Sequence, residues 1–200
     1  MHKNNNMNHT TIRKQLRKEK IQARNNLTLE ERNEFSKLIA EQIVKTQAFQ
    51  KAHTIMIYRA IKGEVRLDNL ETLAKDKRFV YPLCLNHGEM IALAPNGPDA
   101  WKDGYCGIKE PVLEQSIQVS PEEIDMVICP CTAFDETGSR LGMGAGFYDR
   151  YLEKCTNAIV TAVAFEVQKT ENIPLEWWDR KMEMVFTEEG IYFFTTACFP

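Results

Sequence analysis

The segment GSRLGMGAGFYDRYL, from Gly138 to Leu152, holds four glycines within its first nine residues and constrains the fold more than any other part of the chain. Glycine loses more backbone entropy on folding than other residues, so such a cluster indicates either a sharp turn or a ligand that lies close to the backbone. An apolar run that ends at Pro130 predicts a buried strand before the segment, and a helix is expected to begin near Phe147. Because ligands bind at the carboxyl ends of strands in an open α/β sheet, the segment is expected to lie at a binding site.

The remainder of the chain alternates between helical and strand patterns. Helices are expected over residues 11–25, 68–77 and 147–155, and one more is indicated by Thr28 and Glu31, which are spaced as a capping box. Strands are expected over residues 54–58, 78–84, 89–94, 123–130, 158–165, 183–187 and 190–194. This alternation predicts an α/β fold with a single open, largely parallel sheet that is flanked by helices on both faces. Residues 1–9 are expected to form a flexible leader and residues 10–200 a single domain, in which residues 95–121 are a looser Gly- and Pro-rich region.

Composition narrows the class of protein. The formal net charge of −3 argues against a protein whose main role is to bind nucleic acid, but it allows a local basic pocket for a small anion. No apolar run of about 18 residues indicates a membrane span, and the Asn-rich start does not resemble a signal peptide. The six cysteines lack the spacing of a zinc site or a disulfide framework, which predicts buried side chains in a reducing compartment. A cytoplasmic protein with no nucleic-acid partner and no membrane partner is therefore expected.

The glycine-rich segment has the composition of an anion site. Backbone N–H groups exposed by glycine, the unpaired N–H groups of a helix start and the Arg140 guanidinium all suit phosphate or carboxylate. Asp149, just inside the expected helix, could hold a magnesium ion that bridges phosphates. The G-x-G-x-G spacing of residues 142–146 matches neither the dinucleotide fingerprint nor the P-loop. The alternative is a surface turn whose following aromatic residues pack into the core.

The longer stretch FDETGSRLGMGAGFYDRYL resembles the signature of the 5-formyltetrahydrofolate cyclo-ligase family, in which the pattern runs Phe-Asp-x-x-Gly-x-Arg-Leu-Gly-x-Gly-x-Gly-Tyr-Tyr-Asp. Weaker likenesses to the family extend over residues 13–188, in RKQLR, GEV, GIKEP, DMVICP and AVAFEVQ. The chain departs from the pattern at two positions. Ala145 stands where many members have Gly or Lys, and Phe147 keeps the ring of the usual Tyr without its hydroxyl.

The resemblance implies a ligase that uses ATP and Mg²⁺ to close 5-formyltetrahydrofolate to 5,10-methenyltetrahydrofolate, with release of ADP and phosphate. In the implied mechanism the γ-phosphoryl group moves to the formyl oxygen, the N10 nitrogen attacks the activated carbon, and phosphate leaves. The implied partners are ATP and 5-formyltetrahydrofolate, with or without further glutamates on its tail, and the implied fold is related to that of sugar-phosphate isomerases and CoA-transferases. Two alternatives stay open: a non-catalytic module that binds MgATP or a metabolite, and an enzyme similar to sugar-phosphate isomerases on a related fold.

The resemblance also assigns residues to the site. The ATP-binding residues that it implies are Arg13, Lys14, Arg17, Arg140, Leu141, Gly142, Met143, Gly144, Ala145, Gly146, Phe147 and Tyr148, with Arg140 also catalytic. The folate-binding residues that it implies are Arg59, Glu64, Tyr105, Met143, Phe147 and Gln168. The metal ligands that it implies are Asp149 and Asp179. Without the resemblance, the sequence around Asp179 fits a residue that caps a helix or turn as well as it fits a metal ligand.

Some of these residues also fit a plainer role. Arg13 and Arg17 lie one helical turn apart and can contact one anion, but they also fit a solvated basic face, and Lys14 competes with Arg13 for the phosphate contact. The glycines are expected to be required because phosphate lies against the backbone. A side chain on Gly144 or Gly146 would then clash with the nucleotide, or with a positive φ if the turn needs one.

Overall fold

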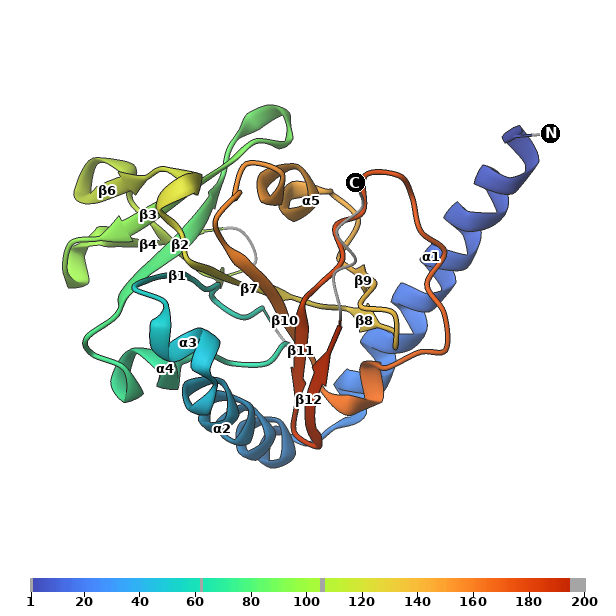
Figure 1. Ribbon diagram of the computed structural model, residues 1–200, viewed down its shortest axis with the longest axis horizontal. Helices are drawn as coiled ribbons and strands as arrows, with labels where there is room; N and C mark the ends of the chain where they lie inside the picture. The colour runs from blue at the N-terminus through green and yellow to red at the C-terminus, as the bar shows by residue number, and fades with distance from the viewer. Residues whose placement is uncertain (1, 62, 105–106, 195–200) are drawn as a thin grey trace.

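The chain is built around one eight-stranded sheet (Figure 1). A computed structural model describes residues 2–61, 63–104 and 107–194. The strands lie side by side in the order β12 (Gly190–Phe193), β11 (Met184–Thr187), β10 (Ile159–Val163), β7 (Met126–Pro130), β1 (Thr54–Met56), β2 (Arg78–Cys84), β3 (Met90–Pro95) and β6 (Ser116–Val119). The five neighbours from β11 to β2 are parallel, whereas β12, β3 and β6 are antiparallel to their neighbours. The expected α/β fold with an open, largely parallel sheet is therefore confirmed.

Helices cover both faces of the sheet (Figure 1). One face is covered by α2 (Leu29–Lys45), α3 (Gln47–Lys51) and α4 (Asp68–Leu73), and the other by α5 (Phe147–Leu152). Helix α2 begins as the sequence predicts: the Glu31 N–H donates to the Thr28 hydroxyl at 3.1 Å, and the Thr28 N–H donates to the Glu31 carboxylate at 2.7 Å. Its apolar side chains then pack onto the sheet, where Ile39 and Ile43 are fully buried.

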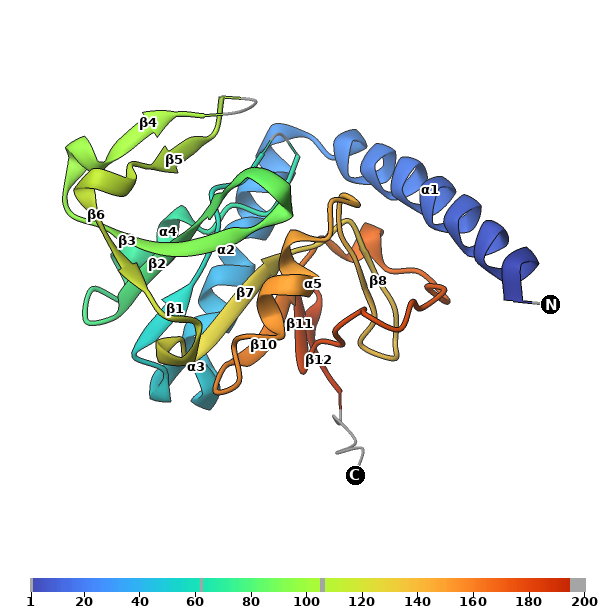
Figure 2. The same ribbon diagram turned by 90° about the horizontal axis from the view of Figure 1, so that it is seen from above.

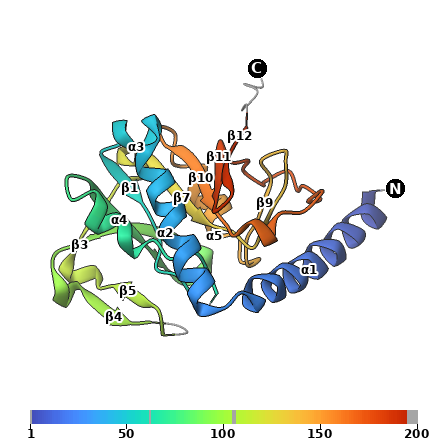
Figure 3. The ribbon, with the colours of Figure 1, turned by 90° about the horizontal axis from the view of Figure 1, so that it is seen from below.

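The first helix, α1 (His2–Asn26), extends well beyond the sheet (Figures 2 and 3). It includes residues that were expected to form a leader. Towards its C-terminal half the helix is anchored to the body of the protein, because Leu16 packs against a small apolar cluster that includes Leu141, and Arg24 is only 1% exposed. Of the helices in the described part of the chain, none combines the length and the apolar character needed to cross a bilayer.

Two hairpins lie outside the main sheet, and one falls in residues 95–121, which hold more regular structure than expected. In that region β4 (Trp101–Asp103) pairs with β5 (Lys109–Pro111), and β6 follows as an edge strand. The second hairpin pairs β8 (Ala133–Phe134) with β9 (Arg140–Leu141) just before the glycines. Strands of two to four residues are too short for an alternating pattern to stand out from neighbouring Gly and Pro.

The path of the chain creates a switch point between β1 and β7. From β1 the chain moves to β2 on one side, and from β7 it moves to β10 on the other side. In open α/β sheets this reversal leaves a crevice at the carboxyl ends of the two strands, and ligands bind there. The segments that follow β1, β2 and β7 meet at this crevice.

Candidate active site

A pocket of about 390 Å³ lies at the switch point. Residues 130–132, which end and follow β7, form one wall together with Cys84 and Glu64, which end β2 and follow β1. Residues 142–146, called the glycine segment below, line a second side, and helix α1 lines a third. The pocket thus gathers residues from the beginning, middle and later parts of the chain.

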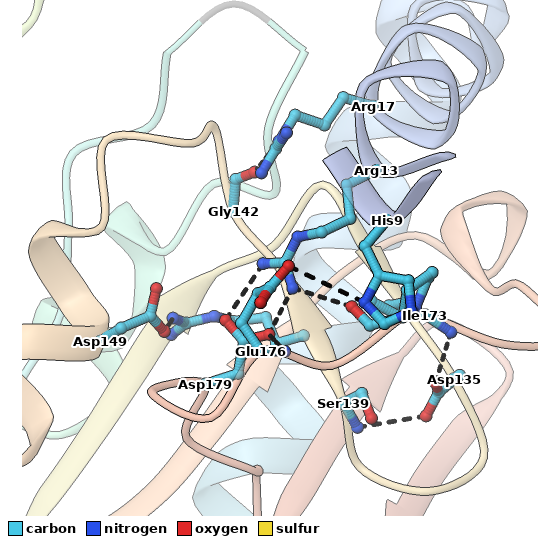
Figure 4. A network of polar contacts seen from close by, with 12 residues as sticks. His9, Arg13, Arg17, Asp135, Ser139, Gly142, Asp149, Ile173, Glu176 and Asp179 are labelled. Atoms are coloured by element: carbon cyan, nitrogen blue, oxygen red, sulfur yellow. Dashed lines mark hydrogen bonds and ion pairs between the residues drawn. The ribbon is translucent and has the colours of Figure 1, made fainter. Parts of the chain in front are cut away.

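The β8–β9 hairpin carries Arg140 into the pocket, and Asp135 shapes its turn. One carboxylate oxygen of Asp135 accepts the Ser139 N–H at 3.2 Å. The other oxygen accepts the Ile173 N–H at 2.9 Å, which ties the hairpin to the chain that follows β10 (Figure 4). Asp135 is fully buried, so it is a scaffold residue that fixes the position of Arg140 rather than a group that meets a ligand.

The Arg140 guanidinium is buried and only partly satisfied. Its Nη2 donates to Asp149 Oδ1 at 2.5 Å, and its Cζ lies 5.6 Å from the centre of the Tyr148 ring. Its Nε and Nη1 are buried and have no hydrogen-bond partner among the residues that the structure describes. Burial by itself would lower the pKa of Arg140, but the charges of Cys129, which is ionised only at high pH, and of Asp149 outweigh it and raise the pKa, so the side chain keeps its charge. A buried cation with unused donors is suited to an anionic ligand.

The cysteines beside Arg140 are not reactive thiols. Burial raises the pKa of Cys129 to about 11 and that of Cys131 to about 12. Both side chains are therefore protonated near neutral pH, and neither is an activated nucleophile. The charge of Arg140 is not neutralised by a thiolate and stays available to a ligand.

The glycine segment bends sharply because two of its glycines adopt conformations that other residues avoid. The φ of Gly144 is +106° and that of Gly146 is +69°. A Cβ on Gly146, the residue that precedes α5, would also lie 2.7 Å from the Arg150 guanidinium. The backbone therefore requires glycine at both positions, whether or not a nucleotide binds. Gly142 differs, because its φ lies outside the left-handed region and a Cβ there would meet no atom within 4 Å.

Helix α1 directs Arg17 towards the glycine segment and Arg13 towards Asp179 (Figure 4). Arg17 Nε donates to the Gly142 carbonyl at 2.8 Å, and Arg13 forms an ion pair with Asp179. Both arginines line the pocket. Burial lowers the pKa of Arg17, and the nearby positive charge of Arg13 lowers it further. An anion bound between the two arginines would offset this repulsion between like charges. Lys14 is exposed and is not part of the pocket lining, which favours Arg13 for the phosphate contact.

The two carboxylates that were expected to bind metal have different surroundings. Asp149 lines the pocket beside Arg140. Asp179 is not part of the lining, its side chain is 3% exposed, and both of its oxygens accept hydrogen bonds from Arg13. One of these oxygens also accepts the Glu176 N–H at 2.9 Å, as a turn cap would. Mg²⁺ usually binds one or two carboxylates together with substrate phosphates. Asp149 fits such an ion because it lines the pocket and only its Oδ1 is bound to Arg140, whereas Arg13 binds both oxygens of Asp179. The role of Asp179 as a metal ligand stays a prediction.

Glu64 is a buried carboxylate in the pocket wall. It is 8% exposed, and its Oε2 accepts the Ile61 N–H at 3.1 Å. Its Oε1 lies 3.7 Å from Arg24 Nη1. Burial raises the pKa of Glu64, and Arg24 and the Ile61 N–H offset only part of that shift. A carboxylate in this setting can accept the paired N–H donors of a heterocycle.

Three further residues expected at the site do not contribute to this lining, and a fourth is not among the described residues. Leu141 is fully buried in the apolar cluster that anchors α1. Gln168 lies behind the wall, where its Nε2 donates to the carbonyls of residues 131 and 132 at 2.7 and 2.9 Å, so its amide supports the wall. Arg59 lines a different pocket. Tyr105 lies outside the described residues, and its place in a folate pocket stays a prediction.

The pocket that holds Arg59 has a volume of about 440 Å³, and Glu64 lines both cavities. In the described part of the chain, its cationic lining residues are Arg32, Arg59, Arg66 and Lys109. The Arg59 guanidinium packs 4.6 Å from the ring centres of both Tyr81 and Trp101 and pairs with carboxylates of α4. Arg32 is half-buried and makes no ion pair with any residue in the described ranges. This second pocket, the basic pocket, is suited to carboxylates.

Sequence reasoning missed one end of the first pocket. Thr10, Glu176 and Trp178 line it there. Trp178 is 45% exposed, and its neighbour Trp177 is 88% exposed. The pair of adjacent tryptophans beside Asp179 is the feature of the sequence that could have indicated this end of the pocket, because large apolar side chains on a surface commonly mark a binding site.

Comparisons with known proteins agree with one another. The model of the 5-formyltetrahydrofolate cyclo-ligase family matches residues 9–188. A Haemophilus influenzae protein named 5-formyltetrahydrofolate cyclo-ligase is 31% identical over 178 residues, which cover 85% of this chain and 94% of that protein. The Escherichia coli K12 protein of the same name is 29% identical over 177 residues, which cover 86% and 97%. The solved structure of a 5,10-methenyltetrahydrofolate synthetase from Aquifex aeolicus matches with a TM-score of 0.82 at 30% identity, over 94% of this chain and 96% of that one.

Proposed function

This chain belongs to the 5-formyltetrahydrofolate cyclo-ligase family, and we infer that it is the ATP-dependent enzyme that converts 5-formyltetrahydrofolate to 5,10-methenyltetrahydrofolate. The observation that supports our assignment of the site is Arg140. Its buried guanidinium has two donor atoms without a partner in the described chain, and it lines a pocket with two further arginines. Charge and unused donors of this kind are what a transferring phosphoryl group needs.

The chemistry explains why the site is built for phosphate. A formyl amide is a weak electrophile and its oxygen is a poor leaving group. Transfer of the γ-phosphoryl group of ATP to that oxygen breaks the terminal phosphoanhydride bond, releases ADP and turns the oxygen into a good leaving group. The N10 nitrogen then attacks the formyl carbon and loses its proton, and phosphate departs. The protein mainly has to position the two substrates and neutralise the charge on the phosphates.

We assign the ATP phosphates to the glycine segment and the arginines around it. Arg13 and Arg17 approach from α1, and Arg140 approaches from the β8–β9 hairpin. Asp149 is the residue that would hold Mg²⁺, which when bound would offset phosphate charge. Asp179 acts in this proposal as the support of Arg13, to which both of its oxygens are bound.

We assign the folate to the part of the pocket that contains Glu64, whose buried carboxylate can accept N–H donors of the pterin. Met143 and Phe147 line the same cavity and supply apolar contact area. The glutamate tail has at least two carboxylates, and each added glutamate brings one more. The basic pocket lies beyond Glu64 and offers the matching charge through Arg32, so we place the tail there.

The decisive experiment is a turnover assay with purified protein, 5-formyltetrahydrofolate and MgATP. The conjugated methenyl product should appear as a gain in near-ultraviolet absorbance, with one phosphate released per product. A non-catalytic module would be stabilised by MgATP and give no product. An enzyme similar to sugar-phosphate isomerases would turn over a sugar phosphate without ATP. The cytoplasmic location and the extent of a single domain over residues 10–200 stay predictions.

A further inference from the structure

Helix α1 runs along the first pocket, so the spacing of residues on the helix gives distances along the pocket. Arg24 contacts Glu64 at one end, Arg17 contacts Gly142 near the middle, and Thr10 lines the other end. Seven residues separate Arg24 from Arg17, and seven more separate Arg17 from Thr10, so at 1.5 Å per residue each interval spans about 10 Å. The pocket therefore has a Glu64 end, a phosphate region in the middle and a distal end about 20 Å from the first.

The distal end presents an aromatic surface. Trp178 lines the pocket there and is 45% exposed, so a large part of its indole is uncovered. The residue is held in place because the next residue, Asp179, binds Arg13 of α1. The exposed Trp177 ring lies edge-on to the Trp178 ring, at 82° with 5.2 Å between ring centres. Glu176 and Thr10 flank it with polar groups.

We propose that Trp178 forms the subsite for the base of the nucleotide, by stacking its indole on the purine ring. The inference rests on the proposed function, because folate at the Glu64 end and phosphates over the glycine segment leave only the distal end for the base. In ATP, the ribose and the phosphates separate the base from the γ-phosphate by a distance close to the spacing of seven residues along α1. Stacking recognises the flat face of a base rather than its edge, so the subsite should prefer purines for their larger area and discriminate weakly among them.

Kinetics of matched variants test the proposal. Trp178→Ala should raise the KM for ATP roughly 5- to 100-fold, since loss of one base–aromatic stack has an effect of that order. The KM for 5-formyltetrahydrofolate should stay near the parental value, and Trp178→Phe should retain most of the ATP affinity. Trp177→Ala is the control, because Trp177 is the adjacent indole, is 88% exposed and does not line the pocket. The preference for ATP over UTP should shrink in Trp178→Ala and persist in Trp177→Ala.

A binding measurement that does not depend on turnover completes the test. The chain has three tryptophans, and stacking should quench only the fluorescence of Trp178. MgADP should therefore quench the parent and Trp177→Phe, but not Trp178→Phe. Equal ATP KM values in the two alanine variants, a rise in the folate KM instead, or full quenching of Trp178→Phe would overturn the subsite. Quenching of the parent by MgADP without cyclo-ligase turnover would support the subsite and refute the proposed function, and the absence of both would refute both.

Discussion

Gly142 allows the contact between phosphate and the glycine segment to be tested without disturbing the fold. A Cβ on Gly142 would meet no protein atom within 4 Å, and its φ lies outside the left-handed region. Gly142→Ala should therefore leave the unliganded protein at least as stable as the parent, since this change at a compatible φ stabilises a protein by about 0.4–1 kcal/mol. Because Gly142 lines the pocket, the added methyl group should still obstruct the nucleotide.

The expected size of the effect follows from ligand linkage. At a concentration 100-fold above its Kd, MgATP should stabilise the parent by about 2.7 kcal/mol. In a chain of this length about 1 kcal/mol changes the Tm by ~2–4 °C, so the MgATP shift should be roughly 5–11 °C. A methyl group pressed against bound phosphate should cost about 1–3 kcal/mol, as overpacking does. Gly142→Ala should then lose roughly one third to nine tenths of the shift at the same MgATP concentration.

Gly97→Ala is the matched control for the same substitution. The φ of Gly97 is +95°, a Cβ there would meet nothing within 4 Å, and the residue does not line the first pocket. An L-residue in that conformation costs about 1–2 kcal/mol, so the unliganded Tm should fall while the MgATP shift is retained. Thermal melts with and without MgATP, together with the KM for ATP, separate the two patterns. A parental MgATP shift and a parental KM in Gly142→Ala would refute the contact between phosphate and this backbone.

Three further substitutions address the other assignments. Arg140→Ala should lower kcat by about 10²-fold or more, because the contact acts mainly in the transition state, and parental single-turnover rates in a folded variant would remove Arg140 from the chemistry. Glu64→Gln should raise the KM for the folate by an amount equivalent to about 1–3 kcal/mol and leave the KM for ATP unchanged. Burial raises the pKa of Glu64, so the parental folate KM should increase as the pH falls towards that raised pKa, and the Gln variant should lack this dependence. Arg32→Ala should raise the KM for folate with a long glutamate tail more than it raises the KM for the monoglutamate. Lys37→Ala, at an exposed position on the same helix, is the control and should change neither KM. Equal effects of Arg32→Ala on both substrates would place the tail elsewhere.

The sequence predicts those features that are encoded locally. The capping box of Thr28 and Glu31 starts α2 where expected, and β2 spans the residues expected for it, because periodic apolar patterns of this length are strong signals. The resemblance also selects part of the pocket lining, since Arg140 and residues 142–146 lie in one continuous motif. Gly144 and Gly146 were expected to be required because phosphate lies against the backbone, with the stability of the unliganded protein unaffected by a side chain there. The structure corrects this, because a positive φ requires glycine at both positions even without a ligand.

Features that depend on contacts between distant segments could not be predicted in this way. The resemblance implies that Asp179 binds metal, which stays a prediction, but it gives no sign that the carboxylate is bound to Arg13, a partner 166 residues away. Gln168 was implied to bind the folate, and the sequence likewise gives no sign that its amide turns inward and donates to the backbone carbonyls of residues 131 and 132. Polar side chains have several possible partners, and only the folded chain determines which of them lies within reach.

The bond between Arg13 and Asp179 has a consequence for the order in which the enzyme becomes active. The two residues are 166 positions apart, so their contact closes nearly the whole chain into one loop. Closing so long a loop is entropically costly and is deferred until the intervening sheet has formed. During synthesis, α1 leaves the ribosome before the segment that carries Asp179 and must wait for that segment, while the sheet between them is being assembled. Turnover should therefore return last on refolding, after the secondary structure and the core have recovered, which makes activity a stringent indicator that folding is complete.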